Sequence, residues 1–173
     1  LYSVPISKSR RHLLRLREIP YLKIFAIAAV WATSTVLLPL VQTPESIDHS
    51  QVVYLLLSRF FFVLAITIPF DIRDMEPDRS QQLKTIPILL GEKQSLRLSY
   101  LFLVIFGTIS AIQYIPQKKW LFLGSMCVSG ITTFLFLKLR YFRKFQFYHY
   151  GILDGTMLLQ GLLILGAFWI TCS

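Results

Sequence analysis

The chain has little of what usually organises a soluble or secreted protein of its size. Among 173 residues there are only 2 cysteines, Cys127 and Cys172, and both lie in apolar stretches. We expect buried thiols there, because this placement favours neither a disulfide framework nor a zinc site. The first twenty residues are basic and lack an apolar core, so they do not have the layout of a signal peptide. No internal repeat or low-complexity stretch divides the chain, which predicts a single transmembrane domain over residues 1–173.

Acidic residues are also scarce, 9 against 18 Lys and Arg, whereas 54% of the residues are hydrophobic and the mean hydropathy is +0.57. A soluble domain does not normally need so much apolar surface. No run shows the two-residue alternation of a transmembrane barrel. Five runs approach the ~20 apolar residues that a membrane-crossing helix needs. The predicted fold class is therefore all-α, a polytopic transmembrane helical bundle of about five spans, at residues 23–41, 51–70, 96–115, 120–137 and 151–171.

Basic residues alternate between the loops that connect these predicted spans. Counting Lys23 and Arg97, at the starts of spans one and three, fifteen Lys and Arg residues lie before the first span or in the loops after spans two and four, and two lie in the loop after span three. By the positive-inside rule, the N-terminus and the loop after span two are cytoplasmic. This pattern accounts for the net charge of +9, so we expect contact with anionic membrane lipid and no nucleic-acid partner. We expect a multi-pass integral membrane protein, located in the cell inner membrane.

Three aspartates, Asp71, Asp74 and Asp78, directly follow the second predicted span. Acidic side chains beside a hydrocarbon-length segment are costly unless something binds them. Carboxylates are ligands of Mg²⁺, which usually keeps waters and substrate phosphates as well. Because Pro77 disfavours one continuous helix, we expect Asp71 and Asp74 on the last turn of the span, and Asp78 on a short surface helix that starts at Pro77. On the residues alone, a magnesium–diphosphate site and a solvated mixed-charge loop are equally good interpretations.

The surroundings of the aspartates add two further expectations. Arg73, Arg79 and Lys84 are cations that could hold the oxygens of a diphosphate. Gly91 has the character of a residue that ends a short helix, which we place at 86–90, before the third span begins.

The stretch from Asp71 to Gly91 resembles the second aspartate-rich motif of the UbiA-type intramembrane prenyltransferases. The family pattern has an Asp-x-x-Asp-x-x-x-Asp or Asp-x-x-x-Asp element, then Arg, Lys-Thr and a Gly before the next helix. All of these occur here at matching spacing, although Leu83 stands where the family often has Gly. Family members have nine spans, with this motif between spans six and seven. The resemblance therefore implies that the chain corresponds to spans five to nine, the C-terminal part of a longer protein.

The resemblance also implies an activity, the transfer of an isoprenyl group from a polyprenyl diphosphate to a hydrophobic, usually aromatic acceptor, as in quinone biosynthesis. It implies Mg²⁺ as cofactor. The residues that it makes catalytic and metal-binding are Asp71, Asp74 and Asp78, and those that it assigns to the diphosphate are Arg73, Arg79 and Lys84.

Two family elements are incomplete in this sequence. The first aspartate motif, Asn-x-x-x-Asp-x-x-x-Asp, is absent, since the chain has no asparagine. The Tyr-x-x-x-Lys element is met only loosely: Tyr2 is present, Ile6 stands at the lysine position, and Lys8 is the nearest cation. Tyr2 and Lys8 are therefore candidate diphosphate-binding residues.

A chamber for the prenyl tail would need apolar walls and could include two charged residues. Arg59 lies ~18 Å along the second span from Asp71, deep in the hydrocarbon, and should pair with a carboxylate or with helix-end carbonyls. Asp154 could face the chamber or favour the positive end of its own helix. Four aromatic residues could line the chamber, but ordinary helix packing or lipid contact is the favoured interpretation; they are Trp31, Phe60, Phe61 and Phe62.

Two other functions stay open from the sequence. A CDP-alcohol phosphotransferase also uses an aspartate-rich metal site at a membrane face, but its Asp-Gly and Ala-Arg pattern is missing around Asp71. A chain without the first aspartate motif could instead be a partial or non-catalytic membrane module. Mg²⁺-dependent binding of a prenyl diphosphate separates these possibilities, because a purely structural module has no reason to depend on the metal.

Overall fold

The computed structural model describes residues 22–42, 48–81, 83–138 and 154–172, and all regular structure in these ranges is helical. Tyr2 and Lys8 lie outside the described residues, as does the side chain of Asp154. The helices are α1 (Leu22–Gln42), α2 (His49–Arg73), α3 (Met75–Ser80), α4 (Ile86–Leu90), α5 (Glu92–Tyr114), α6 (Trp120–Lys138) and α8 (Asp154–Cys172).

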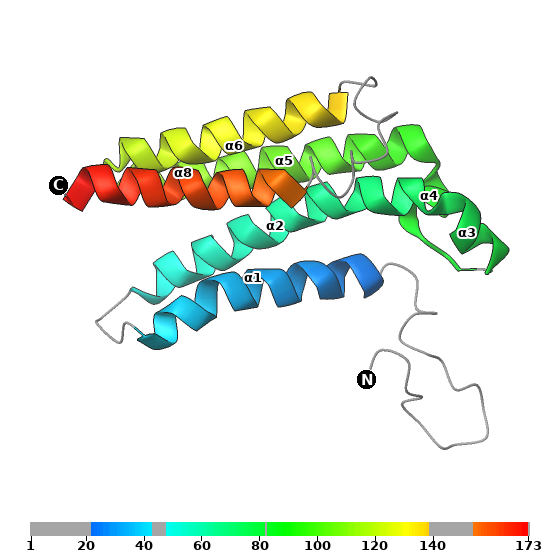
Figure 1. The fold of residues 1–173 in the computed structure, drawn as a ribbon, viewed down its shortest axis with the longest axis horizontal. Helices are drawn as coiled ribbons and strands as arrows, with labels where there is room; N and C mark the ends of the chain where they lie inside the picture. Colours follow the sequence, from blue (N-terminus) through cyan, green and yellow to red (C-terminus); the bar gives the residue numbers. More distant parts are fainter. Residues whose placement is uncertain (1–21, 43–47, 82, 139–153, 173) are drawn as a thin grey trace, which may run out of the picture.

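Five long helices run along one another in a bundle (Figure 1), and their contacts form a single row. Along this row α1 packs against α2, α2 against α5, α5 against α6, and α6 against α8. The short helices α3 and α4 lie at one end of the row, where α2 ends and α5 begins. The prediction of an all-α membrane bundle is confirmed, and each predicted span is a helix.

Length and composition qualify α2, α5 and α6 as membrane-crossing helices. The apolar parts of α1 and α8, Leu22–Leu38 and Gly155–Thr171, are shorter. Large apolar side chains point outward on all five long helices, as expected for surfaces in contact with lipid. Cys127 on α6 is exposed as well, so the expectation of a buried thiol is wrong for it, because it lies in an open groove between α5 and α6.

The central helix α2 is held by close packing and by polar contacts to its neighbours. Phe62 of α2 packs on Phe106 of α5, with ring centroids 5.1 Å apart, and both side chains are buried. The hydroxyl of Ser99 on α5 donates a hydrogen bond to the carbonyl of Ala65 on α2. Lipid is as apolar as the core, so such packing and hydrogen bonds, rather than removal from water, hold membrane helices together. They position the end of α2 that carries the aspartates.

Backbone conformation sets the ends of the helices around that site. Gly91 caps α4 with φ +81° and ψ 162°, a conformation that is nearly restricted to glycine. It turns the chain from α4 into α5, so the predicted segment 86–90 and its terminating glycine are confirmed. At the opposite end of α2, Asp48 caps the helix by accepting a hydrogen bond from the backbone amide of Ser50 at 3.1 Å.

Candidate functional site

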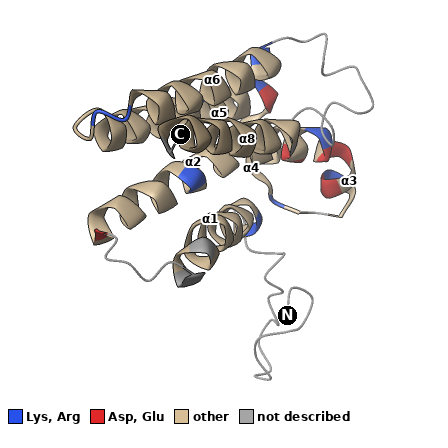
Figure 2. Cartoon of the chain, turned by 60° about the vertical axis from the view of Figure 1, so that its left-hand side comes forward, with Lys and Arg blue, Asp and Glu red and all other residues tan. Residues whose placement is uncertain are grey.

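The three aspartates lie together where α2 meets α3. Asp71 is on the last turn of α2, Asp74 caps that helix, and Asp78 is on α3. Asp71 and Asp78 are buried, with exposed fractions of 4% and 7%. Figure 2 shows acidic residues gathered around α3. The carboxylate of Asp71 is close enough to those of Asp74 and Asp78 for electrostatic interaction, so the structure brings the predicted acids into one site.

The start of α3 differs from the sequence prediction. The helix begins at Met75, so Pro77 is its third residue rather than its first. A proline in the first turn removes no helical hydrogen bond, because the amides there have no partner within the helix. Asp74 therefore joins the two helices, because it is both the C-cap residue of α2 and the N-cap residue of α3.

Cations pair with two of the acids. The ammonium Nζ of Lys23, in the first turn of α1, lies 2.8 Å from Oδ1 of Asp71. The guanidinium of Arg73 reaches both carboxylate oxygens of Asp74, at 2.7 and 3.0 Å. Arg79 and Lys84 are exposed near the same end of the bundle.

Lys23 is a site residue that the sequence reasoning missed. It had been counted only among the charges that set membrane orientation. The available signal was its place at the start of the first predicted span, which the distribution of basic residues predicts to lie on the same side of the membrane as Asp71. Lys23 reaches Asp71 only because α1 packs against α2.

One carboxylate oxygen of the site has no partner. Oδ2 of Asp78 is buried and accepts no hydrogen bond from any residue that the structure describes. A buried, unsatisfied carboxylate oxygen is costly, and such an atom in a native fold needs a reason.

The donor set is compatible with Mg²⁺, although no group of three or more acidic, His or Cys residues in the described ranges is arranged to hold a metal. Mg²⁺ is usually held by one or two protein carboxylates, with waters and phosphate oxygens completing its shell. Asp78, with its free oxygen, and Asp71 can supply those two carboxylates. The residues therefore fit the metal that the sequence motif implies.

Two adjacent cavities lie between the aspartates and the middle of the bundle. The first, of about 270 Å³, is lined by mostly apolar residues of α1, α2 and α8, together with the charged side chains of Lys23, Asp71, Arg73 and Asp74. The second, of about 520 Å³, has mostly apolar walls from α1, α2 and α8. They share three wall residues, Trp31, Val63 and Met157. A ligand with an anionic head and an apolar tail would have a place for each part.

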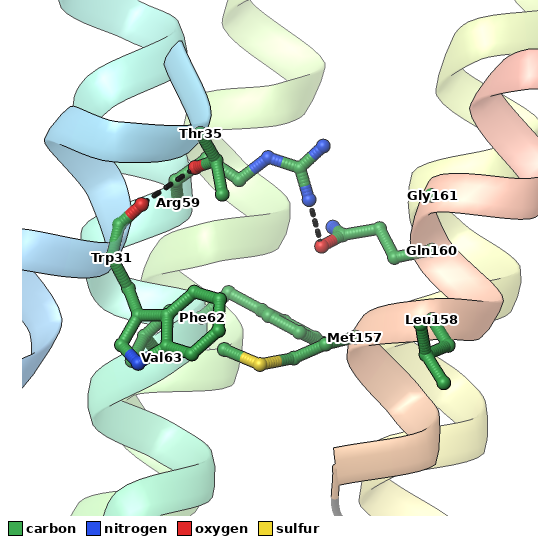
Figure 3. Close-up of a pocket in the computed structure, with 9 residues that line it drawn as sticks. All are labelled: Trp31, Thr35, Arg59, Phe62, Val63, Met157, Leu158, Gln160 and Gly161. Atoms are coloured by element: carbon green, nitrogen blue, oxygen red, sulfur yellow. Dashed lines mark hydrogen bonds between the residues drawn. The ribbon is translucent and has the colours of Figure 1, made fainter. Parts of the chain in front are cut away.

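Two of the four aromatic residues considered for a chamber line the large cavity. Trp31 and Phe62 line it, with Met157 across from them on α8 (Figure 3). Phe60 and Phe61 instead pack against other rings, at centroid distances of 5.7 Å from each other and 5.9 Å between Phe61 and Phe102. For these two aromatics, ordinary helix packing is the correct interpretation.

Arg59 also lines the large cavity, where it has a partner that was not predicted. Its guanidinium Nη1 donates a hydrogen bond to Oε1 of Gln160 on α8, across the cavity (Figure 3). The amide of Gln160 in turn lies 3.3 Å from the sulfur of Met126 on α6. No carboxylate pairs with Arg59 within the described part of the chain. The glutamine was not predicted, because nothing in its local sequence indicates that it faces Arg59.

Comparison with known proteins agrees with this arrangement at the level of family. A model of the family described as "UbiA prenyltransferase family" matches residues 1–146, a range that includes every aspartate and cation of the site. No curated protein and no solved structure matches the chain.

Proposed function

The chain belongs to the UbiA prenyltransferase family, and from that premise we propose that Asp71, Asp74 and Asp78 bind the diphosphate of an isoprenyl diphosphate through Mg²⁺. The isoprenyl group is then transferred to a hydrophobic acceptor, which we expect to be aromatic. The membrane setting follows from the family and from the three membrane-length helices. The aspartate end is proposed to face the cytoplasm, on the distribution of basic residues.

The observation that supports this proposal is that a cavity lined by charged side chains lies next to a mostly apolar one. The cavity at Asp71 and Asp74 shares the walls Trp31, Val63 and Met157 with the larger apolar cavity. A prenyl diphosphate has the same division, since a highly charged head is joined to a hydrocarbon tail. A site for a purely polar metabolite would have no use for the 520 Å³ of apolar space behind the acids.

Each part of the site has a separate task in this reaction. Asp71 and Asp78 would hold the metal, and when bound, Mg²⁺ supplies positive charge that stabilises the diphosphate as a leaving group. Arg73, Arg79 and Lys84 would donate hydrogen bonds to diphosphate oxygens.

The apolar cavity would orient the tail and keep water away from the allylic carbon. The bond between this carbon and the diphosphate oxygen breaks, and its electron pair leaves with the diphosphate. A new bond then forms from the allylic carbon to the acceptor, which loses a proton.

The direct test is binding of an unreactive thiolo analogue of farnesyl diphosphate to the full-length protein in detergent, with and without Mg²⁺. We expect binding to require Mg²⁺ and to weaken by about 10- to 100-fold in Asp78→Asn, which removes a charged partner of the metal. Glu76→Gln is the matched control, because Glu76 is an exposed acid on the same short helix.

Two results would contradict the proposal. Binding that does not depend on Mg²⁺ would favour a non-catalytic membrane module. Equal losses in Asp78→Asn and Glu76→Gln would mean that the overall charge of α3, rather than a site at Asp78, attracts the diphosphate.

A further inference from the structure

Lys23 makes a contact that membrane orientation does not explain. A lysine that serves only as a topological charge extends toward lipid headgroups and water. Lys23 instead directs its ammonium at Oδ1 of Asp71, 2.8 Å away, on the neighbouring helix. It is also close enough to Asp74 and Asp78 to interact electrostatically with both. Its direct contact is with Asp71, and its charge is also attracted to the other two aspartates.

The ammonium of Lys23 contacts a carboxylate, that of Asp71, which we assign to the proposed metal. Lys23 and Asp71 line the same cavity, and Lys23 occupies one oxygen of a carboxylate that we assign to Mg²⁺. Two cations cannot share one carboxylate oxygen at close range without repelling each other. Lys23 contacts only Oδ1 of Asp71, and a metal at either oxygen of this carboxylate would repel the ammonium and so favour its release.

The side chain of Lys23 is suited to such an exchange. It is 34% exposed, while its partner Asp71 is buried, so the lysine is the half of the pair that has space to move. A lysine carries a compact charge with three donors on a flexible four-carbon stem. The neighbouring cation, Arg73, is instead held in a two-point contact with Asp74.

We propose that Lys23 is an exchangeable counter-ion of the aspartate site. Without metal it neutralises Asp71. When Mg²⁺ and the diphosphate bind, its ammonium leaves Asp71 and donates hydrogen bonds to a diphosphate oxygen. This inference rests on the proposed function and assigns Lys23 a positioning role in it.

The exchange predicts opposite effects on two affinities. A resident cation competes with the metal alone but assists the metal–diphosphate pair. In Lys23→Met, Mn²⁺ alone should bind several-fold tighter, because its competitor is gone. The thiolo analogue of farnesyl diphosphate, in the presence of Mg²⁺, should bind about 10-fold more weakly, since one charge-assisted hydrogen bond is lost.

The experiment measures both affinities on the full-length protein in detergent, with free Mn²⁺ followed by electron paramagnetic resonance. Lys23→Arg keeps the charge and should retain most of the analogue affinity. Lys93→Met is the matched control, because Lys93 is an exposed lysine at the start of another helix at the same end of the bundle. We expect it to change neither affinity.

A second readout uses the unaltered protein, in case Lys23→Met does not fold. Acetylation of lysine amines, quantified by mass spectrometry, should rise at Lys23 when Mg²⁺ alone is added, because its ammonium is released. Acetylation should fall again when the analogue is added with Mg²⁺.

Several outcomes would overturn the inference. The first is Mn²⁺ binding that is unchanged or weaker in Lys23→Met. The second is a change of both affinities in Lys93→Met that equals the change in Lys23→Met. The third is acetylation of Lys23 that does not depend on Mg²⁺. Failure of the proposed function looks different, because the unaltered protein would then bind no analogue in the presence of Mg²⁺.

Discussion

The two ends of α2 both carry aspartate, but in opposite electrostatic surroundings. At its start, Asp48 is exposed and accepts hydrogen bonds from the amide and hydroxyl of Ser50, at 3.1 and 2.6 Å. The helix dipole favours negative charge there. At its other end, Asp71 and Asp74 lie where the dipole disfavours negative charge, and Asp71 is buried as well.

This difference separates an aspartate that serves folding from aspartates that do not. Asp48 does what an N-cap residue does, by completing the hydrogen bonds of the first turn. The acids at the other end need Lys23 and Arg73 to offset their charge, and Asp78 still keeps an unsatisfied oxygen. Carboxylates that are unfavourable for the fold by itself are best explained by a ligand. The predictions below test this contrast.

The largest effect should come from Asp71→Asn. It removes a proposed metal ligand and leaves the ammonium of Lys23 without its charged partner. We expect binding of the prenyl diphosphate analogue with Mg²⁺ to fall by about 100-fold or more. Isothermal titration calorimetry on the detergent-solubilised protein measures this loss. Affinity within a factor of two of the unaltered protein would show that the acids at the two ends of α2 do not differ in function.

A backbone change near the aspartate end should come next. Gly91→Ala forces an alanine into the conformation with φ +81° and ψ 162°, which costs about 1–3 kcal/mol. Because α4 packs on α2, part of this strain should reach the site, and analogue binding should weaken together with thermal stability. Gly124→Ala on α6 is the control, since a methyl group there meets nothing within 4 Å. Equal melting temperatures for the two variants would argue against the strained turn.

The middle of α2 offers an intermediate case. Gln160→Leu removes the hydrogen-bond acceptor of Arg59 inside the large cavity, which should destabilise the bundle by about 1–3 kcal/mol. Thermal unfolding in detergent measures the change, with Gln94→Leu, an exposed position on α5, as the control. Unchanged stability in Gln160→Leu would mean that Arg59 does not depend on this hydrogen bond between α2 and α8.

The smallest effect should come from the folding aspartate itself. Hydrogen bonds donated by Ser50 hold the pKa of Asp48 below its ordinary value of 3.8. Its contribution to stability is therefore complete above that value and is lost as the pH falls below it. Asp48→Asn keeps a good capping side chain, so stability at neutral pH and ligand binding should stay unchanged. As the pH falls below 3.8, the folding stability of this variant should decrease less than that of the unaltered protein. Circular dichroism against pH tests this, and a loss of analogue binding would contradict it.

Much of this protein could be predicted from local sequence. The apolar runs place the five long helices within a few residues, because a helix that crosses a membrane needs a run of that length. Gly91 marks the end of α4, because few other residues tolerate its conformation. The spacing of Asp71, Asp74 and Asp78 indicates one acidic site next to the membrane, since they end one helix and begin the next. The start of α3 was misplaced by two residues, because proline is tolerated throughout the first turn.

Tertiary structure decided the partners of these residues. Lys23 and Asp71 are 48 positions apart, and Arg59 and Gln160 are 101 apart, so no local pattern joins either pair. They meet because α1 packs on α2, and because the row of helices curves until α8 faces α2 across the cavity. The same curvature separates Trp31 and Phe62, which line the cavity, from Phe60 and Phe61, which pack among other rings. Local sequence specifies where each helix begins and ends, whereas side-chain partners depend on which helix faces meet.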